Sequence, residues 1–349
     1  MRRRTFLSLT AAAACLSQVR ADEKRVRVGL IGTAHSHAAG KLESLRKQQQ
    51  IFEVVGAVEP DEARRKQAAA TKTYEGLAWL TERELLEQKI DAVVIESSIA
   101  EFVPTALRCA AAGVHMHVEK PAGPSMPEFR RLAGLCREKK LVLQLGYMLR
   151  YNPAFEFCYR AAKEGWLGTI HELHGVIGSN IGTAARKNWA LYPGGAMFEL
   201  GAHMIDSAVM VLGKPTAVHS FLRRSRPQQD SLADSTLAVL EYPHATATIR
   251  SAAIDAEAGA RRTFSIHGDK GSVTILPIEP PNLKMTLLEP AGDYPKGTHA
   301  IKLAPMTGRY DAQLAHFTKM IRGEASGLRE DHDVDVHETL LRASGMPIE

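Results

Sequence analysis

Short apolar runs alternate with amphipathic stretches through the first part of the chain. The runs that predict strands are residues 26–32, 52–58, 90–95, 114–118 and 141–145. Helical patterns lie between them, as in residues 103–112, which Gly113 is placed to end, and again in residues 125–139. Apolar strands that alternate with helices are typical of a parallel, doubly wound α/β sheet.

The pattern changes after residue 145 to strands that are joined by short turns. The candidate strands are residues 170–177, 217–223, 236–242, 245–249, 262–267 and 272–276. The turns at residues 242–244 and 267–271 are short enough for β-hairpins. We therefore expect a first domain over residues 22–145 and a second domain, residues 146–349, with an open, mostly antiparallel sheet and few helices.

Residues 1–21 fit neither domain and predict an export signal of the twin-arginine type. Arg3-Arg4-Thr5-Phe6-Leu7 matches the core of such a signal, and an Ala-rich apolar run and a small-residue cleavage site follow it. The run is too short to remain in a bilayer, so we expect a periplasmic protein without stable membrane insertion. An uncleaved anchor and lipidation at Cys15 are the alternatives.

Charge and cysteine content narrow the functional classes. The chain has 349 residues and a formal charge of +5, and loss of residues 1–21 removes four arginines and no acid, which leaves +1. Nothing in this balance indicates a nucleic-acid partner. The three cysteines that remain form no C-x-x-C pair, so the sequence predicts neither a disulfide framework nor a zinc site.

The turn after the first strand predicts a dinucleotide-binding domain. A strand, a glycine turn and a helix place the helix N-terminus where a pyrophosphate binds. Counted from Gly32, the G-x-G-x-x-G pattern has Ala34 and His37 in place of its second and third glycines. Thr33, Ser36 and the free amides at the helix start remain candidate phosphate ligands.

Acidic and hydroxyl residues follow the next strands. Glu59 ends the second strand, where an acid binds the ribose hydroxyls and repels a 2′-phosphate, so NAD is favoured, with NADP possible. The alternative is a turn acid before Pro60. Asp61 is instead suited to cap the following helix. Ser97 and Ser98 follow the third strand and are further candidates for cofactor contact.

Glu119-Lys120-Pro121 ends the fourth strand. Ligands of open α/β sheets bind at the carboxyl ends of the strands, so Lys120 stands where chemistry is expected. A solvated lysine in a surface loop is the alternative.

Three further blocks follow this one in order: residues 146–153 (GYMLRYNP), residues 194–206 (GGAMFELGAHMID) and residues 212–215 (LGKP). Together with residues 113–121 (GVHMHVEKP), they resemble the Gfo/Idh/MocA oxidoreductase family over essentially the whole mature chain. The resemblance implies a Rossmann domain, an open-faced antiparallel sheet domain, a nicotinamide cofactor and a sugar or cyclitol substrate.

The family's catalytic lysine, acid and histidine correspond to Lys120, Glu199 and His203, with Glu199 in place of the more usual aspartate. On a helix Glu199 and His203 share one face, and they could also be only a stabilising i, i+4 pair. Histidine suits proton exchange near neutral pH, and lysine favours a developing alkoxide. Asp206 lies on the same helix face.

The remaining site candidates come from the flanking blocks. Arg150, Tyr151 and Asp206 are expected to contact the substrate, and Glu119 the cofactor. Phe102 stands where many relatives have a histidine. His35 and His37 are not spaced for a rigid metal site, so no metal is expected, and we prefer roles for them in the phosphate loop or at the mouth of the substrate site. Ala34 and His37 are counted among the expected cofactor contacts.

We therefore expect an exported NAD(P)-dependent oxidoreductase that acts on a sugar or cyclitol hydroxyl and retains its cofactor. Redox-neutral glycoside hydrolysis with the same residues is a second hypothesis, and a sugar-binding protein without turnover is a third. The exposed sheet face that the family resemblance implies predicts a homo-oligomer.

Overall fold

A computed structural model describes residues 24–329 and 331–349. The predicted export signal, residues 1–21, lies outside the described residues. Within the described ranges, every helix is too short or too polar to cross a membrane.

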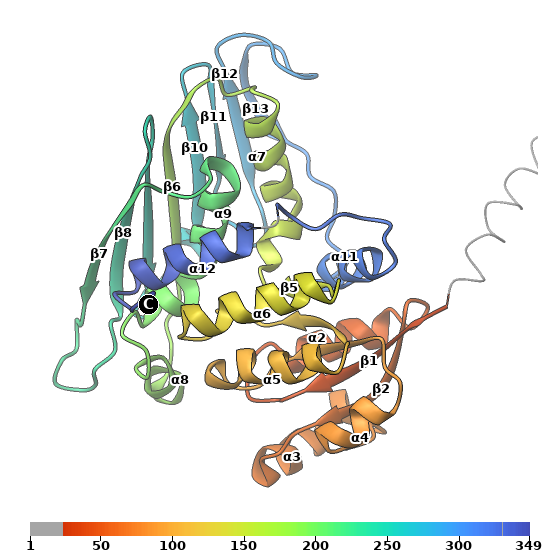
Figure 1. The fold of residues 1–349 in the computed structure, drawn as a ribbon. Helices are drawn as coiled ribbons and strands as arrows, with labels where there is room; N and C mark the ends of the chain where they lie inside the picture. The colour runs from red at the N-terminus through yellow and green to blue at the C-terminus, as the bar shows by residue number, and fades with distance from the viewer. Residues whose placement is uncertain (1–23, 330) are drawn as a thin grey trace, which may run out of the picture.

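The first domain contains a parallel five-stranded sheet in the order β2-β1-β3-β4-β5 (Figure 1). Its strands are β1 (Val26–Ile31), β2 (Phe52–Val58), β3 (Ala92–Ile95), β4 (His115–Val118) and β5 (Leu143–Leu145). All five were predicted from the apolar runs, and β3 to β5 begin one or two residues later than predicted. The order reverses at β1 and β3, which creates the crevice where doubly wound sheets bind ligands.

The helices of this domain end and begin at local sequence signals. They are α2 (Ala38–Lys47), α3 (Glu62–Ala69), η1 (Lys72–Tyr74), α4 (Glu82–Glu87), α5 (Ile99–Ala111) and α6 (Met126–Glu138). Asp61 caps α3 by accepting a hydrogen bond from the Arg64 backbone N–H, as predicted. Gly113, with φ of +78°, follows α5 in a conformation that glycine adopts easily.

The second domain contains a mostly antiparallel eight-stranded sheet in the order β13-β12-β11-β10-β6-β9-β8-β7. Its strands are β6 (Ile170–Gly178), β7 (Ala217–Arg223), β8 (Ser235–Glu241), β9 (Thr246–Ala252), β10 (Thr263–Gly268), β11 (Gly271–Ile275), β12 (Leu283–Leu287) and β13 (Gly297–Ile301). The two predicted hairpins join β8 to β9 and β10 to β11. Among the described strands of this sheet, only β6 and β9 pair in parallel.

The expectation of few helices in this domain is wrong. It carries η2 (Met148–Tyr151), α7 (Pro153–Lys163), α8 (Thr183–Trp189), η3 (Met197–Gly201), α9 (Ala202–Leu212), α10 (Ala258–Arg261), α11 (Asp311–Ile321) and α12 (His332–Ala343). Helices α7, α9 and α12 lie along one face of the sheet (Figure 1). Phe155 of α7 packs on Phe264 of β10, with ring centroids 5.0 Å apart. The apolar face of the sheet needs this cover, because the inward side chains of its strands are buried.

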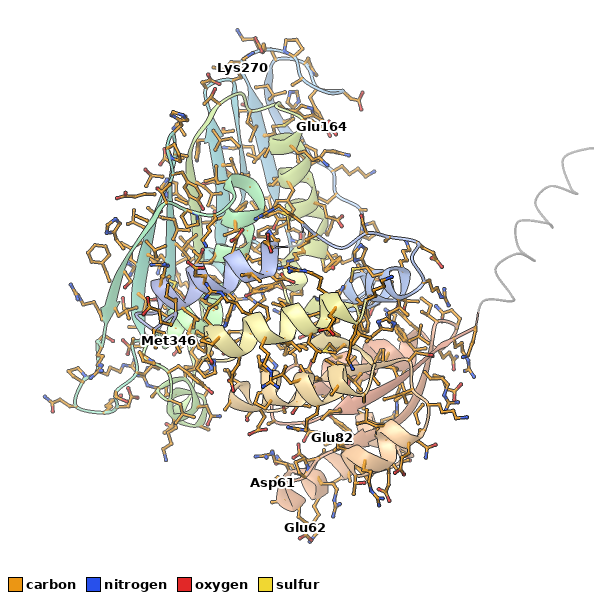
Figure 2. The ribbon with its side chains drawn as sticks, viewed as in Figure 1. Asp61, Glu62, Glu82, Glu164, Lys270 and Met346 are labelled. Atoms are coloured by element: carbon orange, nitrogen blue, oxygen red, sulfur yellow. The ribbon has the colours of Figure 1, made fainter. Side chains whose placement is uncertain are left out.

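Helix α11 returns from the second sheet to the first domain. Asp311 accepts hydrogen bonds from Ser44 Oγ at 2.6 Å and from Lys47 Nζ at 2.7 Å, both on α2. Gln313 donates to the carbonyl of Leu145 at the end of β5. Lys270 lies near one end of the molecule and Glu62 near the other (Figure 2).

Candidate active site

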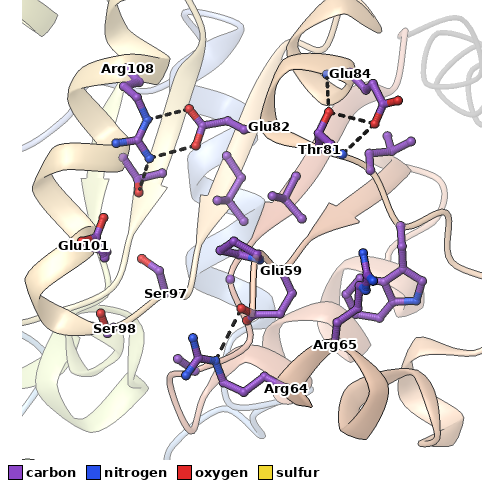
Figure 3. Close-up of a pocket in the computed structure, with 18 residues that line it drawn as sticks. Glu59, Arg64, Arg65, Thr81, Glu82, Glu84, Ser97, Ser98, Glu101 and Arg108 are labelled. Atoms are coloured by element: carbon purple, nitrogen blue, oxygen red, sulfur yellow. Dashed lines mark hydrogen bonds and ion pairs between the residues drawn. The ribbon is translucent and has the colours of Figure 1, made fainter. Parts of the chain in front are cut away.

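A cavity of about 570 Å³ lies at the carboxyl ends of β1, β2 and β3 (Figure 3). Its lining includes the predicted cofactor residues Gly32, Ala34, Glu59, Ser97 and Ser98. Arginines also reach it, and Figure 3 shows Arg108 bound to both carboxylate oxygens of Glu82. The sequence analysis did not single out these arginines, because exposed arginines on helices carry no motif.

Gly32 forms the close turn that the cavity needs. Its φ is +90°, and a Cβ at this position would lie 2.4 Å from the backbone N and Cα of Ser97. Only glycine fits there. The buried hydroxyl of Ser97 has no hydrogen-bond partner among the described residues. A narrow backbone cradle with an unsatisfied hydroxyl beside it fits the pyrophosphate of a dinucleotide, despite the two replaced glycines.

Glu59 lies in the cavity and is already hydrogen bonded. Its Oε2 accepts from the Thr33 backbone N–H at 2.8 Å and from Thr33 Oγ1 at 2.7 Å. Its Oε1 accepts from the Asp61 N–H at 3.0 Å and from Arg64 Nε at 3.4 Å. Ribose hydroxyls at Glu59 would therefore replace the Thr33 hydroxyl or Arg64. Thr33 contributes to the site through Glu59.

Two further cavities continue the first one toward the second domain. A cavity of about 530 Å³ shares Ala34, Arg64, Ser97 and Ser98 with the first. A chamber of about 100 Å³ shares Ser36, Trp189 and Glu199 with that second cavity. We call the first two cavities the cofactor track and the last one the catalytic chamber. Their length and continuity suit an extended dinucleotide that ends beside the chamber.

The catalytic chamber brings Lys120, Glu199 and His203 together. Lys120 Nζ donates to the Glu199 backbone carbonyl at 3.0 Å and lies 3.2 Å from Glu199 Oε1. His203 is buried and its Nδ1 has no hydrogen-bond partner among the described residues. The lysine comes from the end of β4 and the other two residues from η3 and α9, so the chamber lies between the domains.

The regular helix expected around Glu199 is interrupted. Residues Met197–Gly201 form a π-helical turn, and α9 begins only at Ala202. Such turns are frequent at functional sites. Gly201 has no room for a side chain here, because a Cβ would lie 2.4 Å from the Met197 sulfur. The spacing rule for a plain α-helix therefore does not describe how Glu199 and His203 reach one chamber.

Protonation states in the chamber follow from burial and charge. Burial raises the pKa of Glu199, but the Lys120 charge and the contact with His35 outweigh it and lower that pKa to about 2. Burial and then the Lys120 charge hold the pKa of His203 well below its usual value. At neutral pH the chamber thus contains a carboxylate and a neutral imidazole.

His35 joins the glycine loop to the chamber. Its Nε2 lies 3.7 Å from Glu199 Oε1, its Nδ1 lies 3.4 Å from Glu96 Oε2, and its ring packs edge-on against Phe102. Burial lowers the pKa of His35, but the carboxylates of Glu119, Glu199 and Glu96 outweigh burial and raise it to about 9. An imidazolium in this loop is thus balanced by acids from three other segments.

A buried lysine lies beneath the loop. Lys41 of α2 is fully buried, and its Nζ lies 2.5 Å from Glu119 Oε1, 3.1 Å from Glu96 Oε1 and in contact with His117. Glu119 also lies 3.1 Å from His37 Nδ1 and accepts from the Lys120 backbone N–H. Glu119 and His37 thus support the chamber floor. Sequence reasoning missed Lys41 and Glu96.

The same groups approach metal-ligand spacing. Ligand atoms of His35, His37 and Glu119 lie within 4.8 Å of one another, and so do those of Glu96, His117 and Glu119. Lys41 Nζ already lies against both Glu119 and Glu96, so one cation of the chain itself is shared by these two acids.

The predicted substrate residues Arg150, Tyr151 and Asp206 lie in another network. Arg150 Nη2 donates to Asp206 at 2.6 Å and to Asp333 at 2.5 Å, and all of Asp206 is buried. Tyr151 accepts from Gln144 Nε2 at 2.9 Å. None of the three lines the cofactor track or the chamber. A substrate contact for them stays a prediction, and the structure gives them bonds that hold α9, α12 and β5 together.

Two family models match the chain. The model described as "Oxidoreductase family, NAD-binding Rossmann fold" matches residues 26–147, and the one described as "GFO/IDH/MocA C-terminal domain" matches residues 156–274. Together these ranges include more than half of the chain and both sheets' central strands.

Curated proteins show the same likeness at lower coverage. Over 189 residues the chain is 31% identical to the uncharacterized oxidoreductase ORF334 of Rhizobium meliloti, over 53% of this chain. It is 26% identical over 193 residues to trans-1,2-dihydrobenzene-1,2-diol dehydrogenase of Sus scrofa, over 54% of this chain. It is 28% identical over 194 residues to inositol 2-dehydrogenase 2 of Saccharopolyspora erythraea, over 55% of this chain. The aligned region spans 56% of the length of each of these relatives.

Solved structures share the whole architecture. UDP-N-acetylglucosamine 3-dehydrogenase GnnA from Acidithiobacillus ferrooxidans superposes with a TM-score of 0.76 at 19% identity, covering 93% of this chain and 98% of that one. GenD2 from gentamicin A biosynthesis, in complex with NAD, gives 0.74 at 23% identity, with 92% and 93% covered. At these identities the likeness shows the fold.

Proposed function

We propose that this chain, which belongs to the Gfo/Idh/MocA family of NAD-binding oxidoreductases, oxidises a hydroxyl group of a sugar or cyclitol. The observation that carries the proposal is the meeting of Lys120, Glu199 and His203 in a chamber that continues the cofactor track. The named activities of relatives that act on inositol and on a sugar nucleotide support this substrate class.

Lys120, His203 and Glu199 have different roles in the chamber. Lys120 is a positive donor that stabilises the substrate oxygen as it gains negative charge. His203 is a neutral imidazole and is placed to accept the hydroxyl proton. Its low pKa makes it a weaker base than a free histidine, so the Lys120 charge must stabilise the substrate oxygen as the proton leaves. Glu199 holds the Lys120 ammonium in place through the 3.2 Å ion pair. NAD, when bound, supplies the hydride acceptor.

The fit of NAD rests on Gly32, Glu59 and the cofactor track. The carboxylate of Glu59 disfavours a 2′-phosphate, whereas Arg64 beside it provides a positive charge that can pair with the 2′-phosphate of NADP. Retention of the cofactor after purification belongs to the same proposal. Mass spectrometry of the native protein and its thermal stability with added NAD or NADP test both points. A protein with no bound nucleotide and no stabilisation by either compound would contradict the proposal.

We further propose export through residues 1–21, supported by the twin-arginine core and the apolar run after it. Fractionation of cells that express the full chain, compared with an Arg3→Lys/Arg4→Lys variant, tests it. Equal amounts of both in the periplasm would contradict this route.

A homo-oligomer is proposed from the face of the second sheet that none of the described helices covers. Phe221 of β7, a large apolar side chain, is 45% exposed. Light scattering of the wild type and of Phe221→Glu tests this, and a wild type that is monomeric at all concentrations contradicts it.

A further inference from the structure

A further cavity, with mainly apolar walls, lies beside the catalytic chamber. It has a volume of about 540 Å³ and shares Glu279 and Arg309 with the chamber. Its other walls come from the turn after β11 and from the loop that leads from β13 to α11. These walls are mainly apolar and include Pro280, Pro281, Ile301, Leu303, Pro305 and Met306. We call it the side cavity.

The size of the chamber requires an extension. Pockets for small molecules usually measure roughly 300–1,000 Å³, whereas the chamber measures about 100 Å³. A molecule with its reacting hydroxyl at Lys120 therefore has to reach beyond the chamber. On the side of Ser36 and Trp189 it would enter the cofactor track. The side cavity is the other direction.

The wall between chamber and side cavity can open at little cost. Glu279 Oε2 lies 3.0 Å from Arg262 Nη1 and 3.3 Å from Arg309 Nη2. The side chains of Glu279 and Arg309 are 34% and 45% exposed. The Glu279–Arg309 ion pair is exposed enough to contribute little net stability, so a substrate hydroxyl can replace it, whereas Arg262 is only 20% exposed.

The turn that contributes Pro280, Pro281 and Asn282 to the side cavity is held by its own hydrogen bonds. Leu276 N donates to the Asn282 carbonyl at 2.9 Å, and Asn282 N donates to the Pro277 carbonyl at 3.1 Å. Asn282 Nδ2 also donates to the Leu276 carbonyl at 2.9 Å. A preformed apolar surface binds an apolar group without ordering a loop first.

We propose that the substrate is a conjugate in which a sugar or cyclitol ring carries an apolar aryl or alkyl group, and that the side cavity binds this group while the ring lies at Lys120 and His203. The inference rests on the proposed function, because it assigns the cofactor track to NAD. Burial of the apolar group removes its surface from water, which gives affinity that the bare ring lacks.

Pairs of glycosides test this. Calorimetry on the NAD-loaded protein compares the 4-nitrophenyl and methyl β-glycosides of glucose, galactose and N-acetylglucosamine. We expect the aryl member of at least one pair to bind at least about tenfold tighter. Met306→Asp places a charge in the side cavity and should abolish this preference, and Leu303→Asp should do the same. Met306 is 41% exposed, so its variant is expected to fold.

Leu288→Asp is the matched control, because Leu288 is 61% exposed and lines neither cavity. Equal affinity within every pair, no binding by any glycoside, or an aryl preference that survives both cavity variants would overturn the inference. NAD affinity is measured first on each protein. A wild type that fails to bind NAD contradicts the proposed function, whereas one that binds NAD and oxidises glycosides without aryl preference contradicts only the side cavity.

Discussion

His35 Nε2 lies 3.7 Å from Glu199 Oε1, and this contact joins the loop after β1 to the catalytic chamber. The loop has lost two fingerprint glycines, and Glu199 stands where the family usually has aspartate. The extra methylene of glutamate lets the carboxylate reach toward both Lys120 and His35. The ion pair therefore joins one departure from the family pattern, Glu199, to the loop that carries the two replaced glycines.

Replacement of His35 by Gln should cost stability in a pH-dependent way. The folded-state pKa of His35 is raised from 6.5 to about 9, so its contribution is complete below pH 6.5 and is lost as pH rises through 9. We expect the free energy of unfolding of the wild type to exceed that of His35→Gln by up to about 3 kcal/mol at about pH 6. At about pH 9.5 the difference should be much smaller. Urea unfolding at both pH values measures the difference. His219→Gln, which removes an exposed partner of Glu241, gives the baseline. A gap that grows with pH would refute the assignment.

Lys41→Met should destabilise the first domain far more than Lys47→Met. Lys41 is fully buried between two carboxylates, and its loss leaves Glu96 and Glu119 as uncompensated buried charges, which costs roughly 3–5 kcal/mol. Lys47, on the same helix, has a 55% exposed side chain, and its loss should cost about 1 kcal/mol or less. Denaturant unfolding of both variants provides the comparison. Similar losses would show that the Lys41 cluster is not charged as described.

Gly32→Ala should abolish NAD binding, whereas Gly76→Ala should not. Both glycines have positive φ, so both variants lose on the order of 1 kcal/mol from backbone strain. Only at Gly32 does the added Cβ collide with the backbone of Ser97, since a Cβ at Gly76 meets no atom within 4 Å. Fluorescence titration with NADH measures the difference. Unchanged affinity in Gly32→Ala would exclude this loop from cofactor binding.

Lys120→Met should lower turnover by about 10² to 10³ while NADH still binds. The variant removes the donor to the substrate oxygen and also the partner of Glu199, so a loss of stability should accompany the loss of kcat. NADH formation with a sugar and cyclitol panel, read together with the NADH titration, separates the two effects. Lys270→Met, which removes a 52% exposed lysine, is the control. Normal turnover in Lys120→Met would assign the chemistry to another residue.

The sequence predicted the first domain well because its information is local. Its strands are short and mostly apolar, and a cap such as Asp61 lies directly before its helix in the sequence. The strands of the second domain were harder to predict from the sequence. Strand β12 alternates in the expected way, with Leu283, Met285 and Leu287 buried, but it is short and was not assigned. Strand β13 contains few apolar residues, so only its pairing with β12 defines it.

The same difference between local and non-local information separates the site residues that the sequence predicted from those that it did not. Lys120, Glu199 and His203 lie in motifs, and the structure brings them into one chamber. Lys41 occurs in a helix with many polar residues, where a lysine normally faces water. Its burial depends on Glu96 and Glu119, which lie at the ends of two separate strands. No spacing in the sequence reveals such a contact. Arg262, Glu279 and Arg309 likewise come from three separate loops, and no spacing in the sequence reveals that they are in contact.

The return of α11 to the first domain limits where the chain can be divided into fragments that fold. Because Asp311 and Gln313 bind α2 and the end of β5, a fragment that stops after β5 would expose the surface that α11 covers. The nucleotide-binding half is therefore completed by α11, which follows the strands of the second sheet in the chain. Exchange of this half between relatives would require α11 to be transplanted with it.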